Sequence, residues 1–284
     1  MATDRRFRRW IVLPDEQIPF HDVASIDAVE RYMADHRWDG CISLGDFLDF
    51  NEISRWVQGK PRQYASARIA DSIKVARGAL KRRTSILRKR NPLARYVLIQ
   101  GNHDARVEEF IDQHPYFEGL LEFQTLLGLK EYRVEWVPYW SDNRQKVKVG
   151  KATFVHGLRT NKYHAQAMVS SYGRNIFYGH THDVQEFGLL LGDNAYTVVG
   201  KSLGCLCDPN AGDLGSGMRY IRGKPQNWQQ AFGVFHFWPT GQFNEYTVKV
   251  FDHAFVSPEG KWYQGREGIG RVGGGDRRPR QARG

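Results

Sequence analysis

Cysteine is scarce in this sequence of 284 residues, and long apolar runs are absent. The three cysteines are an odd number, and Cys205 and Cys207 are separated by one residue, which excludes a disulfide framework. No run approaches the roughly 18 apolar residues of a membrane-spanning helix. The charged N-terminus is not followed by the apolar stretch of a signal peptide. We therefore expect a soluble, cytoplasmic protein in a reducing compartment.

The close pair Cys205 and Cys207 could in principle bind a metal ion. The sequence has no second pair of cysteines to complete a tetrahedral site, because the third cysteine, Cys41, stands alone in a predicted strand. Plain packing is the favoured interpretation of the pair.

Acidic residues are outnumbered, since 41 Lys and Arg face 31 Asp and Glu and give a net charge of +10. A basic chain favours anionic partners such as nucleic acids, nucleotides and phosphorylated substrates, without choosing among them. A hydrophobic content of 41% is typical of a folded protein. We predict one domain over residues 1–264, followed by a disordered basic tail, rich in Gly and Arg, over 265–284.

Apolar runs and amphipathic segments alternate in the first hundred residues. Buried strands are predicted at 11–13, 40–44 and 96–100. Asp22 predicts the N-cap of a first helix, and a long helix is expected from about 65 to 90 within a helical insertion of about 60–92. The order βαβαβ favours a mostly parallel sheet.

Short β segments separated by turns dominate after Tyr132. Strands are expected at 134–137, 146–149, 152–155, 176–178 and 196–199, with a closing hairpin of 232–238 and 246–251. Two more helices are predicted at 106–113 and about 162–172. The pattern alone indicates a parallel α/β first half and a β-rich second half.

Polar side chains follow several predicted strands, where ligands bind in open α/β sheets. Carboxylate, carboxamide and imidazole donors are ligands for divalent ions such as Mn²⁺, Fe, Zn²⁺ or Ni²⁺. In extended backbone, residues i and i+2 point the same way and can hold one ion together. The strand-end candidates are Asp15, Gln17, Asp46, Asp49, Asn102, His103, Asp104, His156, His180 and His182.

Asp46 is the candidate to bridge two ions. Two ions about 3.5–4 Å apart share one water and lower its pKa towards neutrality, which makes it a hydroxide nucleophile. The strand-end residues therefore predict a dinuclear metal centre.

The ordered set resembles the calcineurin-like metallophosphoesterase superfamily from Asp15 to His182. The matching motifs are Gly45-Asp46-Phe47-Leu48-Asp49, Gly101-Asn102-His103-Asp104, His156 and Gly179-His180-Thr181-His182. The resemblance implies a four-layer α/β/β/α sandwich of two mixed sheets flanked by helices. The sequence departs from the family at Gln17, where the family usually has His.

The resemblance also implies a role for each residue. The first ion would be bound by Asp15, Gln17, Asp46 and His182, and the second by Asp46, Asn102, His156 and His180. His103 would donate a proton to the leaving oxygen, and Asp49 would orient its imidazole. A carboxamide is a weaker ligand than imidazole for Zn²⁺ or Fe, so we expect the first site to prefer Mn²⁺, to be weakly occupied, or to fill with substrate.

These observations predict a metallophosphoesterase that hydrolyses a phosphodiester of a nucleic acid or nucleotide by attack of a metal-bridging hydroxide. Phe50 and Asp104 stand where the protein-phosphatase branch usually has Arg and Glu, which argues against that branch. The alternatives are a phosphomonoesterase of broad specificity, and a catalytically silent module that binds phosphate or nucleic acid through an impaired first metal site.

Asp104, Arg106 and the basic helix can each be interpreted in two ways from the sequence. Asp104 is predicted to cap the helix at Arg106 rather than to act in catalysis. Arg106 either binds a substrate phosphate or occupies a solvated helix position. The basic residues of 74–90 either contact nucleic acid or form a solvated helix face.

Overall fold

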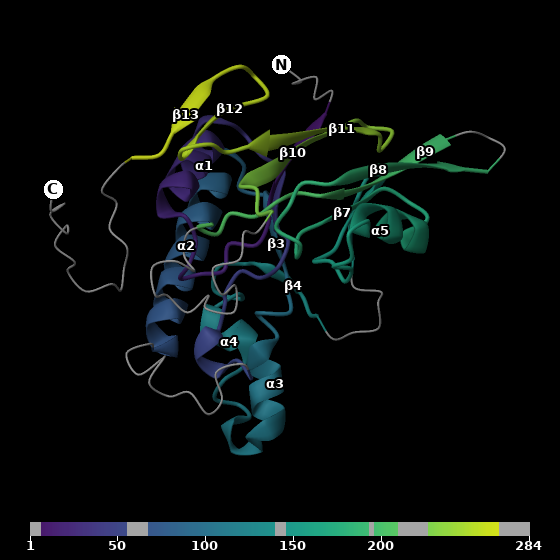
Figure 1. Cartoon of the computed structure of the whole chain (residues 1–284). Coiled ribbons are helices and arrows are strands. Elements are labelled where there is room, and N and C mark those ends of the chain that lie inside the picture. The colour runs from purple at the N-terminus through teal and green to yellow at the C-terminus, as the bar shows by residue number, and fades with distance from the viewer. Residues whose placement is uncertain (1–6, 56–67, 140–145, 193–195, 210–226, 267–284) are drawn as a thin grey trace, which may run out of the picture.

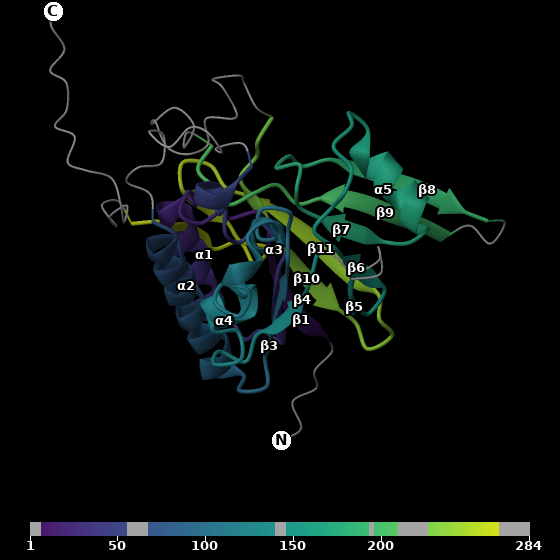
Figure 2. The same ribbon diagram turned by 90° about the horizontal axis from the view of Figure 1, so that it is seen from below.

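Two mixed β-sheets packed face to face form the centre of the protein, with helices on both outer faces (Figures 1 and 2). The structure is a computed structural model and describes residues 7–55, 68–139, 146–192, 196–209 and 227–266. On one side lie α1 (Val23–Asp35) and α2 (Ile69–Arg90), and on the other lies α5 (His164–Tyr172). The predicted four-layer α/β/β/α sandwich is confirmed.

The first sheet contains residues from both ends of the chain. Its strands lie in the order β11 (Phe243–Lys249), β10 (Ala231–Phe237), β1 (Arg8–Leu13), β2 (Gly40–Ser43), β3 (Arg95–Ile99) and β4 (Glu135–Val137). The strands β1 to β4 run parallel, and β10 pairs antiparallel with β1. The element order confirms an α/β first half and a β-rich second half, but the two halves do not correspond to the two sheets, because β4 and the β10–β11 hairpin belong to the first sheet.

The second sheet has the order β5 (Val147–Val149), β6 (Ala152–Phe154), β7 (Ile176–Tyr178), β9 (Tyr196–Ser202) and β8 (Glu186–Leu191). Strand β8 is not predicted from the sequence, since its apolar run contains a glycine and no β-branched residue. The small hairpin of β12 (Ala254–Val256) and β13 (Trp262–Gln264) packs on α1. The remaining helical segments are η1 (Asn51–Ile53), α3 (Arg106–Gln113), η3 (Pro115–Phe117) and α4 (Phe123–Leu127).

Side chains of β1 alternate between two hydrophobic cores. Ile11 and Leu13 face the helical layer of α1 and α2, while Trp10 and Val12 face the second sheet. A strand covered on both faces needs apolar residues at every position, which explains the uninterrupted apolar runs in the sequence. A third core fills the space between the second sheet and α5.

The start of α1 agrees with the sequence. Asp22 caps α1, since its Oδ1 accepts the Ser25 N–H at 3.0 Å. The predicted start of the long helix near residue 65 lies outside the described residues, and α2 itself is the connection between parallel strands β2 and β3. None of the helices that the structure describes is long and apolar enough to cross a membrane.

The predicted tail begins with two residues that contact the domain. The Gly265 N–H donates to the His253 carbonyl at 2.9 Å, and Arg266 forms an ion pair with Asp27 of α1 at 2.6 Å. The rest of the predicted tail, 267–284, lies outside the described residues.

A buried ion pair joins α2 to the loop that follows β1. Both terminal nitrogens of Arg83 donate to the two carboxylate oxygens of Glu16 at 2.6 Å, and its Nε donates to Glu30 of α1 at 3.0 Å. The side chains of Arg83 and Glu16 are 1% and 0% exposed. Glu16 is the residue between Asp15 and Gln17, so this ion pair fixes the first predicted metal-binding segment to the helical layer.

We predict that Arg83→Met lowers the free energy of unfolding by about 3–5 kcal/mol, because it leaves the Glu16 carboxylate buried without its partner. Urea denaturation followed by circular dichroism measures the change.

The matched control is Arg82→Met. Arg82 also pairs with Glu30, at 3.1 Å, but its side chain is 55% exposed. A solvated pair contributes at most about 1 kcal/mol. Equal losses in the two variants would contradict a specific role for the buried pair.

Candidate metal centre

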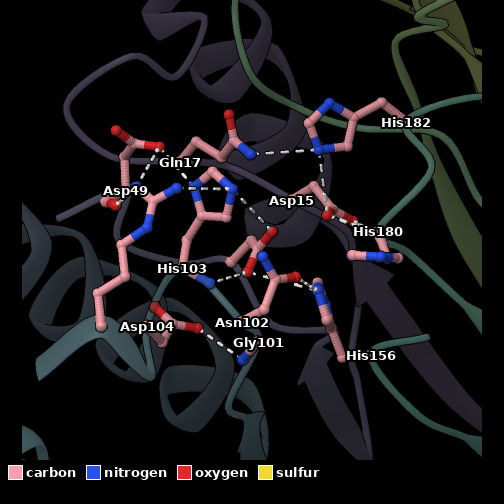
Figure 3. Close-up of polar contacts among 12 residues, drawn as sticks. Asp15, Gln17, Asp49, Gly101, Asn102, His103, Asp104, His156, His180 and His182 are labelled. Carbon is pink, nitrogen blue, oxygen red and sulfur yellow. Dashed lines mark hydrogen bonds and ion pairs between the residues drawn. The ribbon is translucent and has the colours of Figure 1, made fainter. Parts of the chain in front are cut away.

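The carboxyl ends of five strands meet at one edge of the sandwich (Figure 3). Each strand brings one or two polar side chains to this edge. They are Asp15 and Gln17 after β1, Asp46 and Asp49 after β2, Asn102 and His103 after β3, His156 after β6, and His180 and His182 after β7. All nine predicted strand-end residues of the ligand and catalytic sets therefore lie together.

Two groups of metal-ligating side chains share Asp46. One group is Asp15, Asp46 and His182, and the other is Asp46, His156 and His180, with the donor atoms of each group within 4.8 Å of one another. Nε2 of His182 lies 3.3 Å from Asp15 Oδ1, and Nε2 of His156 lies 3.4 Å from Asp46 Oδ1. The shared carboxylate is 1% exposed and stands between the two groups.

The backbone at these positions is left-handed rather than extended. The φ angles are 39° at Asp15, 50° at Gln17, 47° at Asp46, 70° at His180 and 60° at His182. Non-glycine residues adopt this region rarely, at a cost of order 1–3 kcal/mol each. The expected extended backbone is therefore wrong for both i and i+2 pairs, and His180 and His182 fall in different groups.

Two motif glycines allow the strand ends to approach one another. A Cβ on Gly101 would come closer than 3.0 Å to the backbone nitrogen and side chain of Asp46. A Cβ on Gly179 would come equally close to Asp15 Oδ2. In the space that Gly179 leaves, both carboxylate oxygens of Asp15 accept the His180 N–H, at 2.9 and 3.0 Å.

The surroundings of His156 fit a cation. Its Nδ1 lies 2.9 Å from the Leu44 carbonyl oxygen, which can only accept, so the ring proton is on Nδ1. Nε2 then turns its lone pair towards Asn102 Oδ1, at 2.9 Å, and Asp46 Oδ1. Three acceptor atoms that face one another are stabilised by a positive charge between them, supplied by a proton or by a metal ion.

Charges in the cluster shift the pKa values in opposite directions. Burial lowers the pKa of His156, but the Asp46 carboxylate outweighs this and raises it to about 9. Burial also opposes protonation of His182, where the hydrogen bond and charge of Asp15 raise the pKa to about 9. Burial and the neighbouring His156 lower the pKa of His180 to about 4. The cluster thus holds protons where the two groups would hold metal ions.

Gln17 also faces this cluster. Its Nε2 lies 3.2 Å from His182 Nε2, and the side chain is buried. Its Oε1 is buried and has no hydrogen-bond partner among the described residues. The amide nitrogen, not the oxygen, faces His182, and a half-turn of the amide would bring Oε1, a donor atom suited to a divalent ion, to that position. His21, four residues beyond Gln17, is in neither of these two groups.

His103 and Asp49 form a pair beside the shared carboxylate. The His103 Nδ1 and Asp49 Oδ1 atoms are 2.5 Å apart, and the His103 backbone N–H donates to Asp46 Oδ1 at 2.8 Å. Arg106 from α3 contacts both members, with Nη1 donating to the Asp49 carbonyl and Nη2 lying 3.2 Å from His103 Nε2. The Arg106 side chain is only 11% exposed, so the solvated interpretation of this residue is wrong.

Asp104 does not cap α3, contrary to the prediction from the sequence. The N-cap position is Ala105, without a side-chain hydrogen bond. Instead the Asp104 carboxylate accepts the N–H groups of Phe47, Leu48 and Gly101, at 3.2, 2.7 and 2.9 Å. Burial and the negative charge of Asp46 raise the pKa of Asp104 to about 8. Asp104 therefore ties the loop after β2 to the loop after β3.

Two aromatic residues at the site are missed by the sequence analysis. Tyr139 follows β4, and its N–H donates to Gln100 Oε1 at 3.0 Å, which places its ring 6.3 Å from that of His156. Assigning β4 to the first sheet would have identified this strand-end residue. Trp228 packs against His182 with ring centroids 4.4 Å apart, and no sequence pattern indicates this contact.

Comparison with known proteins gives relatives of modest similarity. No family model matches the chain. The Gene 54 protein of Mycobacterium phage L5 is 26% identical over 241 residues, covering 80% of this chain and 88% of that protein. The Gene 54 protein of Mycobacterium phage D29 is 25% identical with the same coverage.

Among solved structures, a Vps29 double mutant from Entamoeba histolytica has a TM-score of 0.40 and 11% identity, covering 90% of this chain and 97% of that chain. The Pseudomonas putida nuclease MPE has a TM-score of 0.30 and 14% identity, covering 84% of this chain and 86% of that chain. Similarities of this size establish no function for this chain.

We predict that Gly179→Ala destabilises the protein by about 1–3 kcal/mol, because the new Cβ displaces the Asp15 carboxylate from the His180 N–H. Thermal unfolding measures the loss, and metal analysis of protein purified from the same preparation should show less bound metal.

Gly188→Ala is the control. Gly188 lies in exposed strand β8, and the nearest atom to its added Cβ is Thr197 Cγ2 at 3.5 Å. Its stability should change by less than about 0.5 kcal/mol. Gly179→Ala with the stability and metal content of the wild type would refute the steric argument.

Proposed function

We propose that this chain is a metal-dependent phosphoesterase that hydrolyses phosphodiesters at the strand-end cluster. The observation that carries the proposal is the position of Asp46, whose single carboxylate belongs to both metal-ligating groups. One carboxylate shared by two ions about 3.5–4 Å apart is the arrangement that two-metal phosphoester hydrolysis uses.

The residues present fit two divalent ions. Asp15, Gln17, Asp46 and His182 would hold one ion, and Asp46, Asn102, His156 and His180 the other. When bound, such ions supply a water nucleophile of lowered pKa and neutralise charge on the phosphate. We propose Mn²⁺, because the first set contains two carboxylates and a carboxamide but only one imidazole.

His103 is the proposed general acid. Its backbone N–H donates to the shared carboxylate, so its ring stands beside the reaction centre, where Nε2 lies 3.9 Å from Asp46 Oδ2. Asp49 contacts the other ring nitrogen and is 0% exposed, so it orients the imidazole. The leaving oxygen would take its proton from Nε2.

The contacts of Arg106 support a role for this residue in substrate binding. A guanidinium group only donates, so its contact with His103 Nε2 uses the lone pair of that nitrogen. A phosphate at the centre offers Arg106 a charged acceptor and draws it away from His103. Nε2 is then free to carry the proton for the leaving group.

The nucleic-acid part of the proposal rests on the charge of the chain and on a few exposed lysines. Most cations of α2 are used within the fold, because Arg77, Arg82 and Arg83 pair with carboxylates and Arg88 and Arg90 donate to backbone carbonyls. Lys74, Lys81 and Lys89 are exposed, and no ion pair of the described residues includes them. If α2 binds a polyanion, these three lysines are therefore the side chains that would contact it.

The decisive assay measures hydrolysis of bis-p-nitrophenyl phosphate with added Mn²⁺. We expect metal-dependent turnover by the wild type, and a fall in kcat of about 10²–10⁴-fold for His103→Ala, because the leaving group loses its acid. Parallel assays with p-nitrophenyl phosphate distinguish a diesterase from a monoesterase.

Gln17→Leu is the comparison variant, since it removes a proposed ligand and keeps the acid. His103→Ala should retain the bound Mn²⁺ of the wild type, whereas Gln17→Leu should bind less. Wild-type protein that binds Mn²⁺ and turns over neither ester would favour the silent binding module.

For the nucleic-acid substrate class, we predict that changing Lys74, Lys81 and Lys89 together to Gln weakens binding to single-stranded DNA. Each lost phosphate contact should reduce the slope of log K against log salt by about 0.7. Changing the exposed Lys130, Lys148 and Lys151 to Gln alters the net charge equally and serves as the control. Equal losses in both triple variants would remove α2 from the interface.

A further inference from the structure

Two buried thiols lie behind His182, on the side of the ring away from Asp15. Nδ1 of His182 is 4.0 Å from the Cys207 sulfur, while Nε2 faces the Asp15 carboxylate. The two sulfurs and a ring nitrogen of His182 lie within 4.8 Å of one another. Cys205, Cys207 and His182 are 0%, 0% and 5% exposed. This group contains no carboxylate.

The fold fixes both thiols in place. Leu206 points into the main core between helices and first sheet, so the cysteines on either side of it point the opposite way. The Leu206 and Cys207 N–H groups donate to backbone carbonyls after β1, and the Cys205 N–H donates to the Gln229 carbonyl at 3.0 Å. The segment is therefore attached to the same loop that carries Asp15.

The surroundings of the thiols favour a soft ion. Phe20 and Trp228 pack against the two cysteines, and Trp228 also covers the His182 ring. Two sulfurs and one imidazole nitrogen in an apolar, buried position select thiophilic ions such as Zn²⁺ over Mg²⁺ or Mn²⁺. The absence of a second cysteine pair does not prevent a site here, because His182 supplies the third donor.

We propose that Cys205, Cys207 and Nδ1 of His182 form a site for one thiophilic metal ion, and that filling it weakens the neighbouring Asp15–Asp46–His182 group. Binding replaces the proton of each thiol by a metal–sulfur bond and releases both protons to solvent. The competition rests on the proposed function, in which His182 Nε2 serves the first Mn²⁺ ion.

The competition follows from the single imidazole. A neutral His182 that offers the lone pair of Nε2 carries its proton on Nδ1. An ion at Nδ1 takes that position, and the displaced proton moves to Nε2, where it occupies the lone pair that the first Mn²⁺ ion would use. Because Gln17 stands where a second imidazole would be, the first group has no other nitrogen ligand to compensate.

The test titrates the full-length protein with Cd²⁺ and records the ultraviolet charge-transfer band of thiolate–cadmium bonds. We expect one equivalent of Cd²⁺ to produce the band in the wild type, and the Cys205→Ser/Cys207→Ser variant to lose it entirely. Cys41→Ser, which removes the buried thiol of the core, should keep it. Circular dichroism verifies that each variant is folded, and Cys207→Ala alone should also reduce the band.

A second measurement tests the competition. Cd²⁺ added to Mn²⁺-loaded protein should release one Mn²⁺ from the wild type, detected by electron paramagnetic resonance, and release less from the double serine variant. A wild type without the band, or a band unchanged in the double variant, would overturn the site. Equal Mn²⁺ release from both proteins would overturn the competition. A normal band in a protein without esterase activity supports the site and counts only against the proposed enzyme.

Discussion

The buried ion pair of Glu16 and Arg83 is the interaction on which the metal-facing edge depends. Glu16 lies between Asp15 and Gln17, and both neighbours have left-handed backbone that costs free energy. The two hydrogen bonds from Arg83 hold the middle residue of this segment against α2, while its neighbours point towards the cluster. A helix on the outside of the sandwich thus determines the position of donor atoms at its edge.

Asp104 likewise holds proposed ligands in position, because it joins the loops after β2 and β3. Its carboxylate collects three backbone N–H groups, two from the segment that carries Asp46 and one from Gly101. Two strand ends are thereby held at the short separation that Gly101 permits. The proposed ligands are oriented by buried ionisable residues that belong to neither ligand set, which is how precise functional sites are generally supported.

The sequence predicts most of the strands and helices and the cluster of strand-end residues, because these depend on local patterns and on one rule of sheet topology. It does not reveal the assignment of β4, since an isolated three-residue strand carries no information about its partner. The roles of Glu16, Arg83 and Asp104 are also hidden. From the sequence, a charged residue in a basic helix is interpreted as solvated, and an acidic residue beside a motif is interpreted as a helix cap. Only the tertiary fold shows that the hydrogen-bond partners of such a residue are buried with it.

The effect of Gln17 on the proposed first site depends on the neighbours of both ring nitrogens of His182. Gln17 offers a carboxamide, so the proposed first group depends on His182 for its nitrogen donor, and the other nitrogen of that ring faces Cys207 rather than a carboxylate. A carboxylate partner would raise the basicity of the ring and hold its proton firmly. A neutral thiol does so weakly, and burial raises the pKa of Cys207 well above its usual range. The carboxamide of Gln17 and the sulfur neighbour of His182 therefore act in the same direction, towards a proposed first site that would release its ion more readily than the proposed second site.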